Sequence, residues 1–295
     1  MRAKETRRLI LAGAAISILS CKGEDYTYRP PEETEKPMPR KFLPMPSHEP
    51  PAKEGPPRME AREEEGGRLN TRTGRGCMEG MAPEGPFCID RFEIVLLDRD
   101  GGMFPWNRHP PEHMEGLRAV SLPSVNPQGH LSQGQAAKAC RNSGKRLCSS
   151  DEWEKACRGP NSNAFPYGPS PGRAICNIGN KPQHILDKYF PDIPHLKRAG
   201  REFNAPMLLL DPAYQTKTGQ MAACVTLSGV YDLDGNMSEW VSDQVTKPGD
   251  GMVYGTFRGA PFSGGAHEGC ARKTTGHDHK YYDYSLGTRC CADKK

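Results

Sequence analysis

The sequence has few apolar residues and no long hydrophobic run. Only 35% of its 295 residues are hydrophobic and 7% are aromatic, whereas glycine and proline number 32 and 28. A chain of this composition does not bury enough apolar surface to fold from end to end, so we expect part of it to lack a packed core. No stretch reaches the roughly 20 consecutive apolar residues that a membrane-spanning helix needs, and we expect no such helix.

A strong excess of charge of one sign is missing as well. The formal net charge is +4, and residues 1–20 supply most of it, with four basic residues against one acidic residue. Because the remainder is close to neutral, contact with a polyanion would release few counterions. We therefore expect no nucleic acid among the partners of this protein.

Residues 1–20 have the pattern of an export signal. A basic start is followed at residues 9–19 by an apolar run of eleven residues, LILAGAAISIL, which is too short to span a membrane and typical of a secretory signal peptide. The signal ends in Ser20, which Cys21 follows. This ending resembles a bacterial lipobox, which implies cleavage before Cys21 and a diacylglycerol group on its sulfur. The alternative is an ordinary signal peptide with an incidental cysteine.

The lipobox resemblance predicts an exported lipoprotein of the bacterial cell envelope, with membrane lipid as its partner through the acylated Cys21. Several acyl chains hold a protein stably at a membrane where one chain does not. Lys22 stands where some bacteria place an aspartate that retains lipoproteins at the inner membrane. We therefore expect the outer membrane rather than the inner one.

Residues 21–76 are predicted to form a disordered tether rich in proline, glutamate and lysine. They carry equal numbers of acidic and basic side chains, almost no aliphatic residues and no hydrophobic period. Such a segment stays extended and holds the following domain away from the membrane. The alternative is a docking segment for another envelope protein.

No two cysteines have the CxxC spacing that is typical of zinc ligands. Of the eleven cysteines, all except Cys21 lie between Cys77 and Cys291. An even number of cysteines in an exported domain predicts a disulfide framework, although counting alone leaves the pairing open. Zinc binding is the weaker alternative, because adjacent cysteines such as Cys290 and Cys291 are poorly spaced as zinc ligands.

Residues 77–295 are predicted to form one α+β domain with short elements. Ser132 with Gln135, and Ser149 with Glu152, fit capping boxes at the starts of two helices over residues 132–142 and 149–158. The other expected elements are strands at residues 87–97 and 256–262, a β-turn-β unit at 229–241 with its turn at 234–235, and an irregular region from 160 to 219 that needs disulfides or bound ions to become ordered.

Several segments occur in an order that is specific to one family. They read CIDRFE at 88–93, GKRLCSSDEWEKACRG at 144–159, GVYDLDGNMSEW at 229–240, and RGAPF at 258–262 with GTRCC at 287–291. This order closely resembles the formylglycine-generating enzyme family, also called the sulfatase-modifying factor family. The resemblance extends from about residue 77 to residue 291, and it implies a C-type-lectin-like fold with little regular secondary structure.

The resemblance also implies which cysteines pair. Two structural disulfides of the family's enzyme match Cys140 with Cys290 and Cys157 with Cys270. For the remaining six cysteines we favour, by position alone, the pairs Cys77–Cys88, Cys148–Cys291 and Cys176–Cys224.

Two calcium sites are implied in the same way. Oxygen ligands on a tight loop suit this hard cation. The alternative is that the acidic residues of the loop are solvated turn residues. The positions that match the family's ligands are, for the first site, Asp232, the carbonyls of Gly235 and Met237, and Glu239, and for a second, incomplete site, Asn177 and Ile178.

The copper site of the family is where the resemblance fails. The enzyme oxidises a substrate cysteine to formylglycine with copper held by two cysteines, because soft Cu(I) needs soft sulfur ligands. Those cysteines belong between the segment that starts at Arg258 and the cysteine that matches Cys270, and no cysteine lies there. Ser263 or Gly264 stands at the first position, and Ser263 with His267 lacks a third partner for nucleophilic catalysis. We therefore expect no catalytic residue of these kinds and no copper.

Histidines offer the remaining candidates for a replacement metal site. His109 and His113 have a suitable separation, but the prolines between them oppose the helix that would bring both imidazoles together. His277 and His279 could point to one side of a strand and bind a metal, with an exposed polar loop as the alternative.

These observations favour an envelope lipoprotein whose domain is a binding or structural module without a catalytic site. Binding residues concentrate on irregular loops that a rigid scaffold holds, and we expect an envelope protein or a glycan as the ligand. One alternative is a divergent oxidase of the same family that uses copper or non-haem iron at a different site. Another is an accessory subunit of a partner enzyme. The fold alone does not decide among them.

Overall fold

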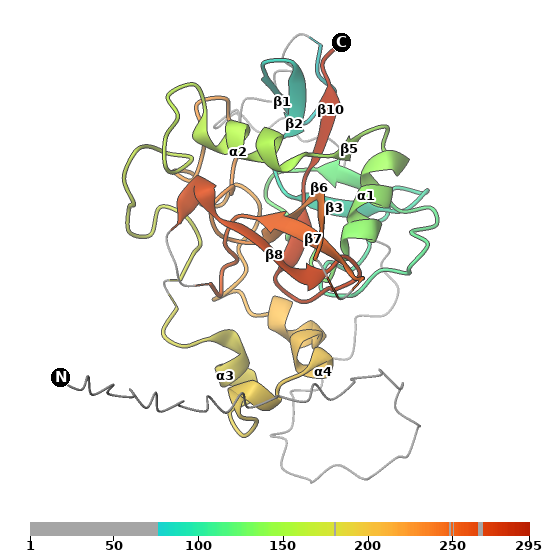
Figure 1. Cartoon of the computed structure of the whole chain (residues 1–295), viewed down its shortest axis with the longest axis vertical. Coiled ribbons are helices and arrows are strands. Elements are labelled where there is room, and N and C mark those ends of the chain that lie inside the picture. Colours follow the sequence, from blue (N-terminus) through green and yellow to red (C-terminus); the bar gives the residue numbers. More distant parts are fainter. Residues whose placement is uncertain (1–75, 180, 248, 250, 265–267) are drawn as a thin grey trace, which may run out of the picture. The chain divides into compact units, whose positions relative to one another are not determined.

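The computed structural model describes residues 76–295 with the exception of 180, 248, 250 and 265–267 (Figure 1). The predicted export signal, the lipidation site Cys21 and all of the tether except Gly76 lie outside the described residues. Among the residues that are described, no helix is long and apolar enough to cross a membrane. Short strands lie mainly at the two ends of this part of the chain and short helices mainly in its middle, as expected for an α+β domain.

The two ends of the described chain meet in a four-stranded antiparallel sheet. The last strand pairs with the first hairpin on one side and with a short central strand on the other, in the order β1 (Met81–Glu84), β2 (Phe87–Asp90), β10 (Cys290–Asp293) and β5 (Arg146–Leu147). The backbone N–H of Lys295 donates to the carbonyl of Gly76 at 3.1 Å. The domain is therefore closed by contacts between its own beginning and end.

A second four-stranded sheet positions the candidate site. Its order is β8 (Lys273–Asp278), β7 (Val253–Arg258), β6 (Ser238–Thr246) and β9 (Leu286–Thr288). β6 pairs with β9 in parallel, which brings Thr288 beside Trp240 and places Arg289 next to Glu239. A separate antiparallel pair is formed by β3 (Ile94–Leu97) and β4 (Arg118–Ser121).

The two longer helices begin where the sequence predicts. In α1 (Gln133–Asn142) the Ser132 side chain accepts from the N–H of Gln135, and the Gln135 side chain accepts from the N–H of Ser132. The same reciprocal capping by Ser149 and Glu152 starts α2 (Ser150–Arg158). Both capping boxes are confirmed, and each satisfies backbone donors that a helix start leaves without partners.

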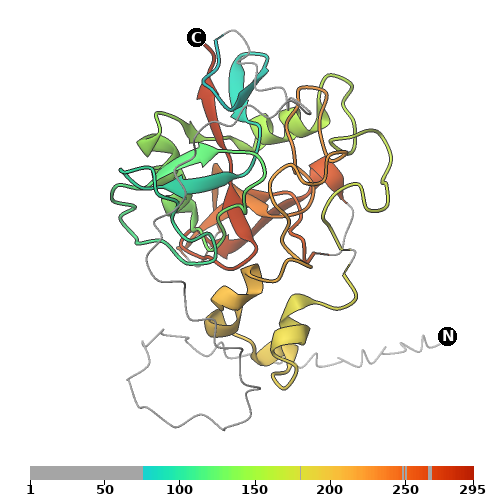
Figure 2. The ribbon, with the colours of Figure 1, turned by 180° about the vertical axis from the view of Figure 1, so that it is seen from behind.

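Short helices occupy the region that the sequence leaves irregular. They are α3 (Ile185–Tyr189), the 3-10 helix η1 (His195–Lys197), α4 (Gly200–Phe203) and the 3-10 helix η2 (Pro206–Leu209). α3 and α4 lie together at the lower end of the domain in both views (Figures 1 and 2). Leu186 of α3, Leu208 of η2 and Phe262 belong to one buried apolar cluster. The sequence prediction misses these helices because each is too short to show a helical period.

The predicted strand boundaries are wrong in three places. Residues 87–97 form two strands instead of one, because the chain leaves the sheet at 91–93 and the Phe92 backbone binds the Ser121 hydroxyl. The β-turn-β unit predicted at 229–241 is not a hairpin, because positive φ angles of 58° at Asp232 and 59° at Asn236 make a loop ahead of β6. The strand predicted at 256–262 begins at 253 and ends at 258, as given above for β7.

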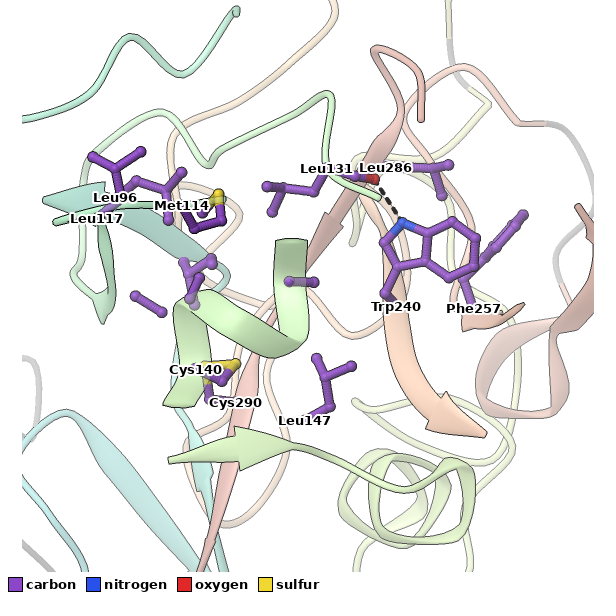
Figure 3. Close-up of a cluster of buried hydrophobic side chains, with 14 residues drawn as sticks. Leu96, Met114, Leu117, Leu131, Cys140, Leu147, Trp240, Phe257, Leu286 and Cys290 are labelled. Atoms are coloured by element: carbon purple, nitrogen blue, oxygen red, sulfur yellow. Dashed lines mark hydrogen bonds between the residues drawn. A yellow bond between two sulfur atoms is a disulfide. The ribbon is translucent and has the colours of Figure 1, made fainter. Parts of the chain in front are cut away.

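The largest apolar cluster surrounds α1 and the second sheet. Trp240 of β6 is fully buried, donates its Nε1 hydrogen to the carbonyl of Leu131 at 2.7 Å, and meets the Phe257 ring edge-on (Figure 3). Cys140 of α1 and Cys290 of β10 belong to the same cluster. A tryptophan buried with its N–H satisfied contributes apolar area without leaving an unpaired donor.

Disulfides engage every cysteine of the described residues. The bonds join α1 and the segment after β5 to β10, and α2 to the segment after β7. The pairs are Cys77–Cys88, Cys140–Cys290, Cys148–Cys291, Cys157–Cys270 and Cys176–Cys224. They are the same five pairs that are expected from the sequence, and the chain is a disulfide-stapled α+β domain.

Candidate functional site

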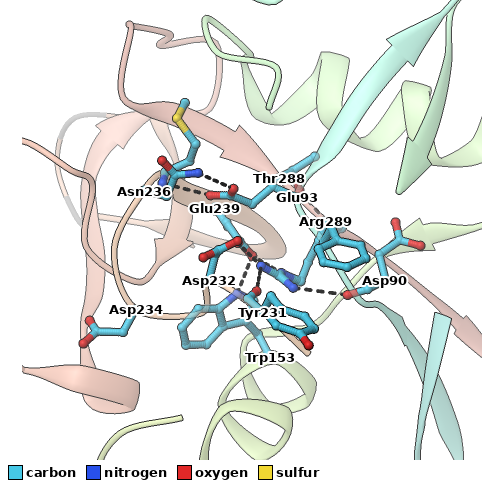
Figure 4. A network of polar contacts seen from close by, with 12 residues as sticks. Asp90, Glu93, Trp153, Tyr231, Asp232, Asp234, Asn236, Glu239, Thr288 and Arg289 are labelled. Atoms are coloured by element: carbon cyan, nitrogen blue, oxygen red, sulfur yellow. Dashed lines mark hydrogen bonds and ion pairs between the residues drawn. The ribbon is translucent and has the colours of Figure 1, made fainter. Parts of the chain in front are cut away.

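A fully buried ion pair lies where several of the segments that carry the family resemblance meet. Arg289 binds both carboxylate oxygens of Glu239 at 2.6 and 2.7 Å, and the two side chains are 0% and 1% exposed (Figure 4). Trp153 of α2 donates its Nε1 hydrogen to the same carboxylate at 2.7 Å. Arg289 also donates to the carbonyl of Tyr231 at 2.8 Å and to that of Asp90 at 3.1 Å. The guanidinium thus ties β2, the 231 segment and β6 together, and Glu239 joins α2 to them through Trp153.

Asp232 lies beside this ion pair and is 1% exposed. Its Oδ2 accepts from the backbone N–H of Gly219 at 2.7 Å, whereas its Oδ1 has no hydrogen-bond partner among the described residues. Burial raises the pKa of Asp232 to about 7; the hydrogen bond from Gly219 and the charge of Arg289 oppose the rise, and the charge of Glu239 adds to it. Near neutral pH this carboxyl group therefore holds a proton part of the time.

Glu93 is a third buried acid in the network. Its two carboxylate oxygens accept from the Asn236 side chain at 2.6 Å and from the Met237 N–H at 2.9 Å. Burial raises the pKa of Glu93 well above its usual range, and the neighbouring charges of Asp232 and Glu239 raise it further. The network holds three acids against one buried arginine, so protonation of the acids relieves an excess of negative charge.

The residues predicted to hold calcium in the first site do not fit the ion in this arrangement. Both oxygens of Glu239 are bound by Arg289, and a divalent cation there would face the guanidinium at close range. The loop of Gly235 and Met237 packs instead on the segment of Asn177, since a Cβ at Gly235 would lie 2.7 Å from the Asn177 carbonyl oxygen. Among the described residues no group of three or more histidine, cysteine or acidic side chains is placed to hold a metal.

Asn177 and Ile178, the start of the second predicted calcium site, form contacts within the fold. The Asn177 amide donates to the carbonyl of Tyr214 at 2.8 Å and to the Asn236 side chain at 3.1 Å. The backbone carbonyl of Asn177 accepts from the N–H of Asn236 at 2.9 Å. Ile178 is 2% exposed and lies in the apolar cluster that contains the Cys176–Cys224 disulfide. These residues join the loop ahead of β6 to the chain around residue 177.

The segment where the family places its copper ligands is used for packing. Arg258 at its start is 2% exposed and pairs with Glu154 of α2. Phe262 is fully buried, and the Ser263 hydroxyl lies 3.1 Å from the Tyr284 hydroxyl. His267, considered above as a base for Ser263, lies outside the described residues. The described part of this segment therefore presents one hydroxyl pair where the family has sulfur.

The four candidate histidines make separate contacts. His109 stacks on Tyr282 with ring centroids 3.6 Å apart, and His113 is exposed in a turn, so the expected absence of a helix over 109–113 is confirmed. His277 stacks on Tyr281 at 4.3 Å, whereas the Nδ1 atom of His279 lies 3.0 Å from the Val253 carbonyl.

A cavity of about 450 Å³ opens elsewhere on the domain. Residues of the loop before β1, of β4 and of the segments around 91 and 229–231 line it, among them Phe92, Tyr231, Arg91 and Arg118. Neither this cavity nor the Glu239–Arg289 pair can be predicted from local sequence. Both are formed by segments that are distant in the sequence, as Glu239 and Arg289 are, with a separation of 50 positions. The GTRCC motif contains Arg289, but the motif by itself does not say which acid the arginine binds.

Comparison with known protein families gives one match that covers most of the chain. The family model described as the sulfatase-modifying factor enzyme 1-like domain matches residues 96–294. No curated protein matches the chain.

Several solved structures resemble the domain at low sequence identity. The structure of CarF is 13% identical, covers 75% of this chain and 96% of its own, and has a TM-score of 0.44. PvdO from Pseudomonas aeruginosa is 15% identical, with 70% and 80% of the two chains covered and a TM-score of 0.42. Variable protein 1 of Treponema denticola is 13% identical, with 74% and 93% covered and a TM-score of 0.45. At these identities the likeness concerns the fold alone.

Proposed function

The chain belongs to the sulfatase-modifying factor family, and we propose that its domain is a non-catalytic binding or structural module of a lipid-anchored envelope protein. The family's copper chemistry depends on two thiolates at one site. Two features support the proposal: the disulfide bonding of the domain's cysteines, and the side chains found in the segment that lacks the two copper-binding cysteines.

The observation that carries the proposal is that every cysteine of the domain is engaged in a disulfide. The sequence has eleven cysteines, of which only Cys21 lies before the domain, and the other ten form five bonds. Thiolates, not disulfide sulfurs, are the strong ligands and nucleophiles. A two-thiolate copper site in this domain would therefore require reduction of a bond of its own framework.

The segment between Arg258 and Cys270 supports the same conclusion from its contacts. Phe262 packs against Tyr214 and Tyr284, with ring centroids 6.2 and 5.8 Å away. A serine hydroxyl is a hard, neutral donor and binds Cu(I) poorly. This part of the chain stabilises the domain through packing, and its sequence has no cysteine at Ser263 or between Ser263 and Cys270.

Export and lipid anchoring complete the proposal. Structural disulfides form and persist outside the reducing cytosol, and five of them agree with the signal-like residues 1–20. We place the domain at the envelope, joined through residues 21–76 to an acylated Cys21, with an envelope protein or a glycan as its ligand. The mass of the amino-terminal peptide of the mature protein tests this part; an unmodified Cys21 would contradict it.

The catalytic part is tested by incubating the mature protein with copper, oxygen and a sulfatase-derived peptide that contains the target cysteine. We expect no aldehyde in the product, measured by mass spectrometry after reaction with a hydrazide. A catalytically active family enzyme in parallel shows that the peptide and copper supply are adequate. Turnover of the peptide by this protein would contradict the proposal and favour the divergent oxidase.

A further inference from the structure

The cavity beside Phe92 and Tyr231 is distinct from the segment that replaces the copper site. None of its lining residues lies between 258 and 270. Its volume of about 450 Å³ falls within the range of small-molecule sites, roughly 300–1,000 Å³. The walls are formed by β4, by the loop at 78–80 and by the residues that flank the buried arginine network.

One wall of the cavity contains two aromatic rings that are held in place. The rings of Phe92 and Tyr231 stack with centroids 5.1 Å apart and planes inclined by 17°. Phe92 is 4% exposed, and its backbone is fixed by the Ser121 hydroxyl, which accepts from its N–H at 3.0 Å and donates to its carbonyl at 3.2 Å. Val120 and Leu122 extend the apolar lining along β4. An apolar wall that is formed before binding lowers the entropy cost of ligand capture.

The charged groups of the lining are mostly cations. Arg91, Arg118 and Lys145 face a single acid, Glu79. Lys145 is bound to Asp90 at 2.8 Å, whereas Arg118 is exposed at the start of β4. Arg118 is therefore the cation that can move most readily toward a ligand.

The position of Arg91 is fixed by the backbone. Its Nη1 donates to the carbonyls of Ser228 at 2.9 Å and Gly229 at 3.0 Å. A Cβ on Gly229 would lie 2.5 Å from that nitrogen, so glycine is needed for this approach. The guanidinium is thus held as part of the cavity wall.

We propose that this cavity binds a small amphipathic anion, a flat apolar ring system that carries a carboxylate or a sulfonate. The ring system would pack on the wall of Phe92, Val120 and Tyr231, and the anion would pair with Arg118 at the rim. Apolar walls with a few placed charges are the usual make-up of ligand sites. The inference rests on the proposed binding function, because it names the ligand class.

The probe that tests this inference is 8-anilinonaphthalene-1-sulfonate, which combines flat rings with one sulfonate and fluoresces on binding. The mature protein should bind it saturably at one site. Arg118→Gln should raise the dissociation constant on the order of fivefold, which is the loss of affinity expected for one partly exposed charge-assisted contact. Lys273→Gln removes an exposed strand cation that is not part of the lining and should leave binding within about twofold.

A second variant and a second probe test the apolar part of the cavity separately from its charge. Val120→Trp fills the cavity and should abolish saturable binding, with its melting temperature measured to show that the domain is folded. N-phenyl-1-naphthylamine, which has the rings without the sulfonate, should bind more weakly and be insensitive to Arg118→Gln. Absence of saturable binding, or equal effects of Arg118→Gln and Lys273→Gln, would overturn the inference. Neither result concerns aldehyde formation, so failure of the cavity and failure of the proposed function are distinguishable.

Discussion

Two regions of the domain differ in how many cysteines they hold. Around β10, sulfur is concentrated: Cys290 and Cys291 each bind a cysteine more than 140 positions earlier in the chain, at Cys140 and Cys148. In the 258–270 segment, sulfur is confined to Cys270, which is itself bound to α2. The difference teaches that this chain has the framework sulfurs of its family without the reactive ones. Variants of the framework cysteines therefore test the stability of the domain, and variants in the 258–270 segment test its catalytic chemistry.

Loss of a framework bond is expected to have the largest effect. The double variant Cys176→Ser, Cys224→Ser opens a loop with a sequence separation of 48, whereas the loop of Cys140–Cys290 would stay closed by the neighbouring Cys148–Cys291. By the chain-entropy argument the free energy of unfolding should fall by about 4 kcal/mol. Cys77→Ser with Cys88→Ser, at a separation of 11, is the matched control and should cost about 3 kcal/mol. Urea unfolding measures both; a smaller loss for the long loop than for the short one would go against this account.

The next largest effect is expected at the buried ion pair. Glu239→Gln leaves Arg289 buried without its counter-charge, and removal of one partner of such a pair costs about 3 kcal/mol or more. Asp293→Asn removes an acid that pairs with Arg146 at the surface and is 86% exposed, and should cost less than about 1 kcal/mol. Denaturant midpoints with unchanged slopes would measure both. Equal costs would show that burial does not determine the strength of these pairs.

A smaller, pH-dependent effect is expected at Asp232. Its pKa is raised from 3.8 to about 7, so the unfolded chain loses this proton at a lower pH than the folded domain does. The contribution of Asp232 to stability is therefore full below pH 3.8 and is lost as the pH rises toward 7. Asn fits the positive φ of 58° and does not titrate.

The melting temperature of Asp232→Asn relative to the unmodified protein should accordingly rise between pH 5 and pH 7.5. Comparison of the two proteins at each pH cancels the titration of other groups, such as His130, whose pKa burial lowers. A difference in melting temperature that is constant across this range would show that Asp232 titrates normally.

The smallest effect is expected at Ser263. Ser263→Ala removes one half-buried hydroxyl contact with Tyr284 and should lower stability by about 1 kcal/mol or less. Ser263→Cys should add one thiol per molecule in a colorimetric titration and still yield no aldehyde, because a single sulfur does not make the two-thiolate site. Aldehyde formation by this variant would show that one restored sulfur is enough.

Local signals predicted local structure well. The capping boxes at Ser132 and Ser149 are complete within four residues, so the starts of α1 and α2 follow from the sequence. The Asp234–Gly235 pair predicts a turn between two strands, because Asp-Gly is typical of hairpins. The parallel pairing of β6 with β9 overrides that local preference.

The long-range disulfides follow from the family resemblance for Cys140–Cys290 and Cys157–Cys270, and from cysteine position for Cys148–Cys291 and Cys176–Cys224. The pairing of Cys157 with Cys270 spans 113 positions, and no spacing rule in the sequence selects it among the other pairings. No spacing rule selects the contact of Arg289 with Glu239 either, and the family resemblance alone suggests calcium as the partner of Glu239. A carboxylate motif does not show whether its partner is a metal ion or an arginine.

The central claim is tested most directly by mapping the disulfides of the native mature protein by peptide mass spectrometry without reduction, after blocking of free thiols. The account predicts the five pairs described above and no blocked cysteine between Cys77 and Cys291. Two blocked cysteines in that range would provide the thiols of a copper site and would contradict the claim that all sulfur in this domain serves its framework.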